Sequence, residues 1–156
     1  MNPYRVEPLA EQDRRAFACG SDALDRYFRE QVTQDMRRRI ATCFVALSSD
    51  GQVAGYYTLA ATSLALDALP PERARKLPRY PVVPAILLGR LAVASGHQGR
   101  RLGSALVADA ILRSSRSEIA GHAIVVDAKD EAALRFYEHL EFIRIPGDAR
   151  RLIRAL

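Results

Sequence analysis

The hydrophobic and polar positions of the N-terminal part change period along the chain. Tyr4–Pro8 is a candidate for a short strand, and the polar stretch around Phe17 is expected to form a helical turn or two. Apolar side chains then recur at helical spacing from Ser21, a good N-cap, to about Arg38. The predicted helix has an apolar face made of Leu24, Tyr27, Phe28, Val32 and Met36.

The next segment favours extended structure. Two strand-like runs, Thr42–Leu47 and Val53–Ala61, flank Ser49-Asp50-Gly51, and Asp-Gly between apolar runs is typical of a hairpin. A further extended stretch at Ser63–Leu66 is expected to continue the sheet. Glu72–Leu77 is predicted as a short helix opened by proline. The prolines that follow it are expected to keep the connection extended.

The centre of the chain, Leu87–Ala110, shows a strand–turn–helix pattern. An apolar strand, Ile86–Val93, leads into a polar, glycine-bearing turn at Ala94–Arg101. A helix is expected to begin at Leu102 or Gly103. Such a turn directs several backbone N–H groups at one place, and the helix N-terminus adds a partial positive charge. The pattern therefore predicts a phosphate-binding site.

The C-terminal part alternates strands and helices. It contains an apolar strand at Ile124–Val126, a helix at Glu131–Leu140 with Asp130 as its N-cap, and strands at Phe142–Ile145 and Leu152-Ile153. With the hairpin, this order predicts an α/β (mixed α+β) fold in one domain spanning residues 1–156. We expect a mixed, mostly antiparallel sheet of about six to seven strands with helices on both faces.

Composition narrows the class of protein. The chain has 156 residues and 49% hydrophobic content, enough for one domain with a sizeable core. No apolar run approaches the ~20 residues that a membrane span needs, and the N-terminus lacks a signal peptide. Cys19 and Cys43 have neither the number nor the spacing of a disulfide framework or a zinc site. We therefore expect a cytoplasmic protein that contacts no membrane and holds no metal.

Charge points to an acidic partner. The net charge is +5, with two lysines against 21 arginines, and arginine binds phosphate through a planar fork of donors. A genomic bias toward arginine, or solvated helix faces, would explain the total equally well. The distribution is more informative, because basic residues gather at Arg37–Arg39, at Arg73–Arg79 and near the C-terminus. This grouping favours a partner larger than a cofactor.

Two segments carry a family resemblance. The turn Gln98-Gly99-Arg100-Arg101-Leu102-Gly103 resembles the Q/R-x-x-G-x-G/A acetyl-CoA loop of the GNAT N-acetyltransferases, with Arg101 in place of the internal glycine. If that position needs a left-handed backbone, a residue other than glycine costs about 1–2 kcal/mol. A guanidinium there could instead reach a pyrophosphate. Ala133–Phe142 resembles the A-x-x-F-Y-x-x-x-G-F segment that closes the domain, with Glu141 in place of glycine.

Five shorter segments carry a narrower resemblance: Cys19-Gly20, Gly55–Leu59, Leu77–Pro81, Leu88–Val93 and Val126–Ala128. Together they resemble the TacT-like acetyltransferase toxins of bacterial toxin–antitoxin pairs. The resemblance implies acetylation of the α-amino group of aminoacyl-tRNA, which blocks translation. It also implies an antitoxin partner of the ribbon-helix-helix type, and it is compatible with a homodimer.

The resemblance also implies roles for individual residues. Tyr137 would act as the catalytic acid that protonates the leaving sulfur, although a tyrosine on the apolar face of a helix is also a normal core residue. Acetyl-CoA would be held by Leu91, Ala92, Val93, Gln98, Gly99, Arg100, Arg101, Leu102, Gly103, Ser104, Asp127 and Phe136. The grouping of basic residues, rather than the resemblance, predicts the tRNA site: we expect one cleft flanked by Arg37, Arg38, Arg39, Arg73, Arg75, Lys76 and Arg79.

The expected reaction needs little help from a general base. An α-amino group has a pKa of ~7.7–8.0, against ~10.4 for lysine, and His97 and His139 are weak candidates for such a base.

Two other interpretations of the function stay open. A related enzyme could acetylate a small-molecule amine or a protein N-terminus. A non-catalytic binding domain is the other reading, and the departures at Arg101 and Glu141 support it.

Overall fold

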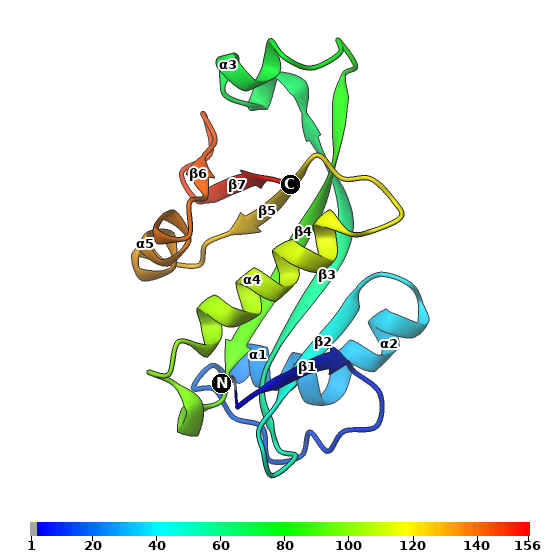
Figure 1. Cartoon of the computed structure of the whole chain (residues 1–156), viewed down its shortest axis with the longest axis vertical. Helices are drawn as coiled ribbons and strands as arrows, with labels where there is room; N and C mark the ends of the chain where they lie inside the picture. Colours follow the sequence, from blue (N-terminus) through cyan, green and yellow to red (C-terminus); the bar gives the residue numbers. More distant parts are fainter. Residues whose placement is uncertain (1–2) are drawn as a thin grey trace. The chain divides into compact units, whose positions relative to one another are not determined.

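A computed structural model describes residues 3–156. The chain forms a seven-stranded sheet with the strand order β1-β2-β3-β4-β5-β7-β6 (Figure 1). The strands are β1 (Arg5–Pro8), β2 (Thr42–Leu47), β3 (Val53–Ala65), β4 (Val82–Val93), β5 (Ala123–Asp127), β6 (Ile143–Arg144) and β7 (Arg151–Ala155). β4 and β5 pair in parallel, whereas β1–β2, β2–β3, β5–β7 and β6–β7 are antiparallel. The predicted mixed, mostly antiparallel sheet is confirmed.

The helices account for most of the remaining regular structure. They are α1 (Asp22–Arg26), α2 (Val32–Arg37), α3 (Pro71–Ala74), α4 (Leu102–Ser115) and α5 (Glu131–His139). A π-helical turn, Tyr27–Gln31, joins α1 to α2, and short 3₁₀ turns lie at Leu66–Ala68 and Ser95–His97. The chain packs into two compact units. Unit 1 comprises the chain up to Ala60 and Leu88–Ala110, and unit 2 comprises Ala61–Leu87 and Ile111–Leu156.

In unit 1, β3 is covered on both faces. The ring of Tyr56 stacks on Phe28 with 4.2 Å between centroids, and its hydroxyl donates to the Leu24 carbonyl at 2.8 Å. The next residue, Tyr57, bonds through its hydroxyl to the Asp109 carboxylate of α4 at 2.6 Å. Because successive side chains of a strand point to opposite faces, the α1–α2 segment and α4 lie on opposite sides of β3. Helices on both faces are thus confirmed.

The predicted N-terminal helix is confirmed with its cap. The Ser21 hydroxyl accepts a hydrogen bond from the Leu24 amide at 3.4 Å, and the helical chain continues to Arg37. The predicted hairpin is confirmed too, since β2 and β3 pair in antiparallel around Gly51, whose φ is +82°. β3 continues without a break to Ala65, as the extended pattern beyond Ala61 indicated.

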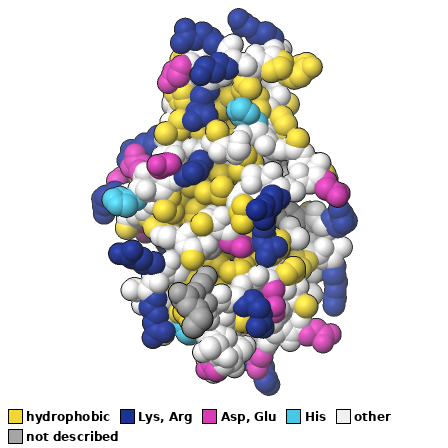
Figure 2. All heavy atoms as spheres, in the orientation of Figure 1, with side chains coloured by type: hydrophobic (Ala, Val, Ile, Leu, Met, Phe, Trp, Pro, Cys, Tyr) yellow, Lys and Arg dark blue, Asp and Glu magenta, His cyan; other side chains and the backbone are white. Residues whose placement is uncertain are grey.

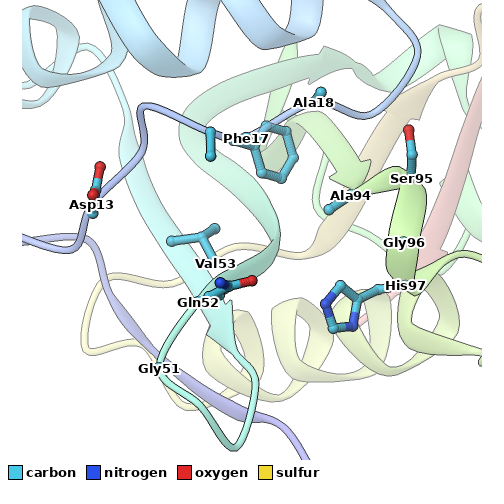
Figure 3. A pocket seen from close by; sticks show the side chains of 11 residues that line it. Asp13, Phe17, Ala18, Gly51, Gln52, Val53, Ala94, Ser95, Gly96 and His97 are labelled. Carbon is cyan, nitrogen blue, oxygen red and sulfur yellow. The ribbon is translucent and has the colours of Figure 1, made fainter.

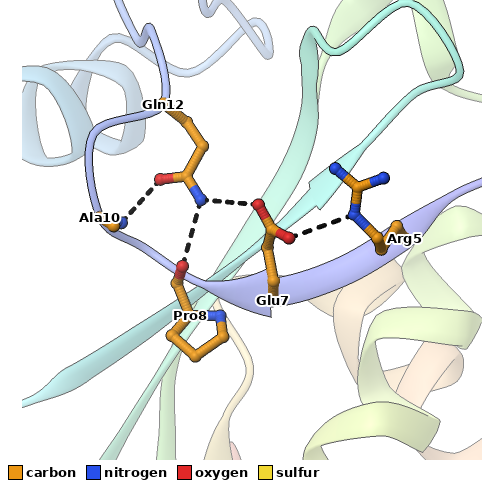
Figure 4. A network of polar contacts seen from close by, with 5 residues as sticks. All are labelled: Arg5, Glu7, Pro8, Ala10 and Gln12. Atoms are coloured by element: carbon orange, nitrogen blue, oxygen red, sulfur yellow. Dashed lines mark hydrogen bonds and ion pairs between the residues drawn. The ribbon is translucent and has the colours of Figure 1, made fainter.

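Of the helical turn or two expected around Phe17, only a single hydrogen-bonded turn forms, in which the Phe17 amide donates to the Arg14 carbonyl at 3.2 Å, and no helix is present. The segment that follows β1 is irregular, because side chains provide partners for its backbone. The Gln12 amide donates to the Glu7 carboxylate at 2.9 Å and to the Pro8 carbonyl, and its oxygen accepts from the Ala10 amide at 2.6 Å (Figure 4). Local side-chain bonds of this kind compete with helix formation.

In unit 2, β4 begins at Val82 rather than at the expected Ile86. Pro84 lies inside this strand, where it lacks a donor but still accepts a hydrogen bond from the His122 amide at 2.8 Å. α3 begins at a proline, as predicted, but ends at Ala74 instead of continuing to Leu77. The core of this unit joins β3, β4, β5 and β7 through Leu64, Val83, Ala85, Val125 and Ile153, and Ile145, directly after β6, packs with them.

Candidate active site

The predicted phosphate loop lies in unit 1 between β4 and α4. Its first residue, Gln98, ties the loop to two neighbouring segments, because its side-chain amide donates to the Val93 carbonyl at 3.0 Å and to the Cys19 carbonyl at 2.9 Å. Gly99 has a φ of +80° and Arg101 a φ of +63°, and α4 begins at Leu102 as predicted. Gln98 therefore shapes the loop with its side chain rather than presenting that amide to a ligand.

The loop offers donors to an anion. Arg100 and Arg101 are exposed, and neither guanidinium forms a hydrogen bond or ion pair with any residue of the described chain. The first amides of a helix have no acceptor within that helix, and α4 is 14 residues long. Gly103 and Ser104 lie in this first turn and are partly exposed. These groups fit a pyrophosphate.

The end of β4 holds the next group of predicted cofactor residues. The parallel ladder with β5 joins Ala85–Leu87 to Ala123–Val125, and Leu91, Ala92 and Val93 follow it along β4. Ala92 is buried, whereas Leu91 and Val93 are partly exposed. A Cβ on Gly55 would lie 2.9 Å from the Ala92 carbonyl oxygen, so glycine is required at that position of β3.

Tyr137 lies in unit 2, on α5. The Asp130 carboxylate caps this helix by accepting from the Ala133 amide at 2.8 Å, which confirms the predicted N-cap. The Tyr137 ring packs edge-on against Phe136 and Phe142, with 5.1 and 5.4 Å between centroids. Burial raises the pKa of Tyr137 to about 12, so its hydroxyl stays protonated at neutral pH.

The Tyr137 hydroxyl remains open to a ligand. Within residues 3–156 it has no hydrogen-bond partner. Ser114 Oγ is the one buried polar side-chain atom without a partner in this part of the chain, so the Tyr137 oxygen is not enclosed in the core. The Tyr137 hydroxyl is therefore a protonated donor without a partner in the described chain.

Asp127, also predicted to line the cofactor site, is engaged locally. Its carboxylate accepts two hydrogen bonds from Arg151 on the adjacent strand β7, at 2.8 and 2.9 Å. Of the histidines considered as a base, His97 is hydrogen-bonded through Nδ1 to the Tyr4 hydroxyl at 2.8 Å, and His139 is exposed. His97 also lines a cavity of about 430 Å³ in unit 1, with Asp13, Phe17, Gln52 and Val53 (Figure 3).

The basic segments predicted to bind tRNA are accessible. Arg37, Arg38 and Arg39 are exposed at the end of α2 in unit 1. In unit 2, Lys and Arg side chains gather on the part of the molecule that carries α3 (Figure 2). Arg75, Lys76 and Arg79 are exposed there, and Arg73 is partly buried. A cavity of about 610 Å³ is lined by Asp67, Ala74, Arg75, Arg79 and Tyr80, among others.

The sequence analysis did not predict the contacts by which the Gly55–Leu59 segment positions its neighbours. Gly55 allows close packing, Tyr56 and Tyr57 bond to opposite helices, and Thr58 Oγ1 accepts from the Arg90 amide of β4 at 3.1 Å. The segment therefore fixes the position of the end of β4. The run of two tyrosines and a threonine in an apolar strand was the signal, because buried hydroxyl groups need partners.

Two properties concern the whole described chain. No helix within it combines the length and the apolar character that a membrane span requires. Among its His, Cys, Asp and Glu side chains, no group of three or more is arranged to hold a metal ion.

Known proteins share both the sequence and the fold. Residues 39–144 match the acetyltransferase (GNAT) domain family. The chain is 38% identical over 153 residues to the tRNA-acetylating toxin of Mycobacterium tuberculosis, a match that covers 97% of this chain and 89% of that protein.

Two solved structures are similar over nearly the full length. The first is AtaT complexed with acetyl-methionyl-tRNAfMet, with a TM-score of 0.89 and 30% identity over 97% of this chain and 94% of that one. The second is a tyrosine-to-phenylalanine mutant of AtaT bound to the C-terminus of the antitoxin AtaR and acetyl-CoA, with a TM-score of 0.80 and 26% identity over 99% and 94%. The matched domain and the near-full-length relative show that this chain belongs to the GNAT acetyltransferase family.

Proposed function

We propose that this chain is a toxin of a toxin–antitoxin pair that transfers an acetyl group from acetyl-CoA to the α-amino group of aminoacyl-tRNA and so blocks translation in the cytoplasm. The observation that carries the proposal is the 38% identity, over 97% of the chain, to a tRNA-acetylating toxin. The structure of AtaT with acetyl-methionyl-tRNAfMet supports the same acceptor. We further propose that residues 1–156 act as one catalytic domain.

The residues present fit acetyl-CoA. The unpaired Arg100 guanidinium and the first-turn amides of α4 would hold its pyrophosphate, and Arg101 would contribute through its left-handed backbone, which shapes the loop. The backbone of Leu91 and Val93 would lie along the pantetheine arm. When bound, acetyl-CoA supplies the acetyl group as a thioester. Phe136, half-buried beside Tyr137, would pack against the same arm. Asp127, whose carboxylate is held in place by Arg151, would also contribute to acetyl-CoA binding.

The acid of the reaction would be Tyr137. Its hydroxyl donates a proton to the departing sulfur as the carbon–sulfur bond breaks, and the phenol regains a proton from solvent. The amine that forms the new carbon–nitrogen bond releases its own proton to water. An α-amino group with a pKa of ~7.7–8.0 has a substantial neutral fraction at physiological pH, whereas a lysine amine with a pKa of ~10.4 has almost none. The α-amine therefore does not require a histidine as its base.

The decisive experiment removes the Tyr137 hydroxyl. We expect Tyr137→Phe to lower acetyl transfer to aminoacyl-tRNA by about 10²–10⁴-fold, with unchanged affinity for acetyl-CoA, because the ring packing against Phe136 and Phe142 is kept. Transfer by Tyr137→Phe at the parent rate would refute the acid role. A parent protein that acetylates a small amine but not charged tRNA would refute the acceptor.

The partners belong to the same proposal. AtaT is bound to its antitoxin AtaR in the similar structure, and we propose that this chain has an antitoxin of the ribbon-helix-helix type and forms a homodimer. Coexpression with the product of an adjacent small gene tests the first point: the antitoxin should restore growth and copurify. The mass of the free toxin in solution tests the second point.

A further inference from the structure

Arg90 on β4 occupies an unusual environment in unit 1. Its guanidinium carbon lies 3.5 Å from the centre of the Tyr27 ring, in the geometry of a cation–π contact. Its backbone amide donates to the hydroxyl of the buried Thr58 at 3.1 Å. The side chain is half-buried. Both ends of the residue are therefore held in place.

The ring beneath Arg90 is itself fixed. The Tyr27 hydroxyl donates to the Asp35 carboxylate at 2.8 Å, and the Gln31 amide donates to the other Asp35 oxygen at 3.1 Å. These two bonds lower the pKa of Asp35, whereas burial and the bond to Asp35 raise the pKa of Tyr27. At neutral pH the phenol is therefore the donor and the carboxylate the acceptor, which gives the ring one orientation.

The donors of Arg90 are unused. Its guanidinium donates no hydrogen bond to any residue of the described chain, although it carries five N–H groups. Arg14 provides a contrast in the same unit: it lies 5.7 Å from the Phe28 ring centre, but it donates to the Phe28 carbonyl at 2.6 Å and to the Thr33 hydroxyl at 2.9 Å. Arg14 is thus engaged within the fold, whereas Arg90 is oriented and free to bind a ligand.

The surrounding charge selects the ligand. Arg38 and Arg90 both act electrostatically on Asp35, so two cations lie near this one carboxylate. Arg37 and Arg39 add positive charge at the adjoining end of α2. A stacked guanidinium with free donors suits a planar or tetrahedral oxyanion bound by two parallel hydrogen bonds. Several cations together favour a repeating anion such as an RNA backbone over a single carboxylate.

Arg90 also adjoins the residues that would hold the reacting group. One residue advances a strand by about 3.3 Å, and Arg90 directly precedes Leu91, whose backbone is assigned to the acetyl-CoA arm. We propose that Arg90 binds a backbone phosphate near the aminoacylated end of the acceptor RNA, and that Tyr27 and Asp35 are its positioning residues. This inference rests on the proposed function and names a contact that decides which acceptors are used.

The test compares acceptors with and without phosphates. Arg90→Lys keeps the charge but loses the paired donors, so we expect the KM for aminoacyl-tRNA to rise about tenfold, with kcat and the KM for acetyl-CoA near the parent values. With an aminoacyl ester of adenosine, which has no phosphate, variant and parent should react equally. Arg15→Lys, at an exposed arginine paired with Asp13, is the control and should match the parent on both acceptors.

The positioning role has its own readout. Tyr27→Phe keeps the ring and should raise the KM for charged tRNA less than Tyr27→Leu, which removes it. Equal KM values for Arg90→Lys and the parent on charged tRNA would refute the role of Arg90, as would equal losses of kcat/KM on both acceptors. Neither outcome would contradict the proposed function. Weakened antitoxin binding with an unchanged KM for tRNA would overturn it in favour of an acidic peptide. A parent enzyme inactive on charged tRNA would refute the proposed function and this inference with it.

Discussion

Two residues stand where the family's segments have glycine, and both adopt the backbone conformation that favours glycine. The φ of Arg101 is +63° and that of Glu141 is +69°. The sequence already indicated a cost of about 1–2 kcal/mol at Arg101 if its backbone is left-handed, and the structure confirms that it is. Both segments keep the backbone geometry that glycine would adopt, with some strain at Arg101 and Glu141. The absence of glycine at these two positions is therefore no argument for a different fold.

At Arg101, glycine should relieve this strain without loss of the cofactor. The side chain is exposed and makes no hydrogen bond within the described chain, so we expect Arg101→Gly to keep or improve the affinity for acetyl-CoA and to raise Tm by a few degrees. Arg100→Gly removes the same charge one residue earlier, where φ is not positive, and should lower Tm slightly. Calorimetry that shows a large loss of affinity for Arg101→Gly alone would assign Arg101 a direct phosphate contact.

The pKa of Tyr137 makes a prediction about the pH profile. Because burial raises this pKa to about 12, the hydroxyl is protonated at every lower pH and its ionisation cannot reduce the rate near neutrality. The value of kcat/KM for aminoacyl-tRNA should therefore rise with pH through the pKa of the α-amine, near ~7.7–8.0, and then level off. Initial rates between about pH 6 and 9.5, corrected for hydrolysis of the aminoacyl ester, measure this. A decline above about pH 8 would indicate a different acid with a lower pKa.

At the scale of elements, α2 and α5 end in the same way. In α5 the Phe142 amide bonds to the Tyr137 carbonyl at 3.1 Å and the Glu141 amide to the Glu138 carbonyl at 3.0 Å, which is the Schellman pattern. α2 repeats it, with Arg39 in the left-handed position. The motif brings Phe142 against Tyr137, so the end of the helix also orients the proposed acid.

Glycine at the end of α5 should stabilise the protein. Glu141→Gly removes about 1–2 kcal/mol of strain. The more flexible unfolded chain offsets about 0.4–1 kcal/mol of this gain, which leaves a net stabilisation between zero and about 1.6 kcal/mol. Loss of the Arg154–Glu141 ion pair should lower the free energy of unfolding very little, because the glutamate side chain is 81% exposed. Glu141→Ala removes the same carboxylate but keeps the strain, and should not stabilise. Denaturant unfolding that ranks alanine with glycine would show that strain is not the cause.

At the scale of the whole molecule, charge is the property that most directly concerns the acceptor. The net charge of +5 comes from a chain with 21 arginines, and the exposed runs at Arg37–Arg39 and Arg75–Arg79 carry part of it in each unit. Neutralising RNA phosphates releases counterions, so binding through these residues should weaken steeply with salt.

Replacing Arg37, Arg38 and Arg39 with alanine tests this contribution. We expect lower kcat/KM for charged tRNA, a salt dependence reduced by roughly 0.7–0.9 in logarithmic slope for each phosphate that the variant no longer neutralises, and unchanged affinity for acetyl-CoA. The helix should survive, because its buried face ends at the partly buried Met36 and alanine favours helix. Alanine at Arg5 and Arg15, each paired with a carboxylate, is the control for charge. Equal rates and equal slopes for the triple variant and the parent would mean that the run is only solvated.

The sequence by itself determined the elements whose causes are local. The Ser21 and Asp130 caps, the Asp50-Gly51 hairpin, the helix start at Leu102 and the mixed sheet were all predicted and are confirmed, because hydrophobic period, capping oxygens and turn residues act within a few positions along the chain. Only the tertiary structure decided the contacts between distant residues. Tyr27 and Arg90, or Gln98 and Cys19, meet although they lie far apart in the sequence. The irregular path around Phe17 has the same origin: the Arg14 and Arg29 side chains bind backbone carbonyls far along the chain, and no local pattern records such partners.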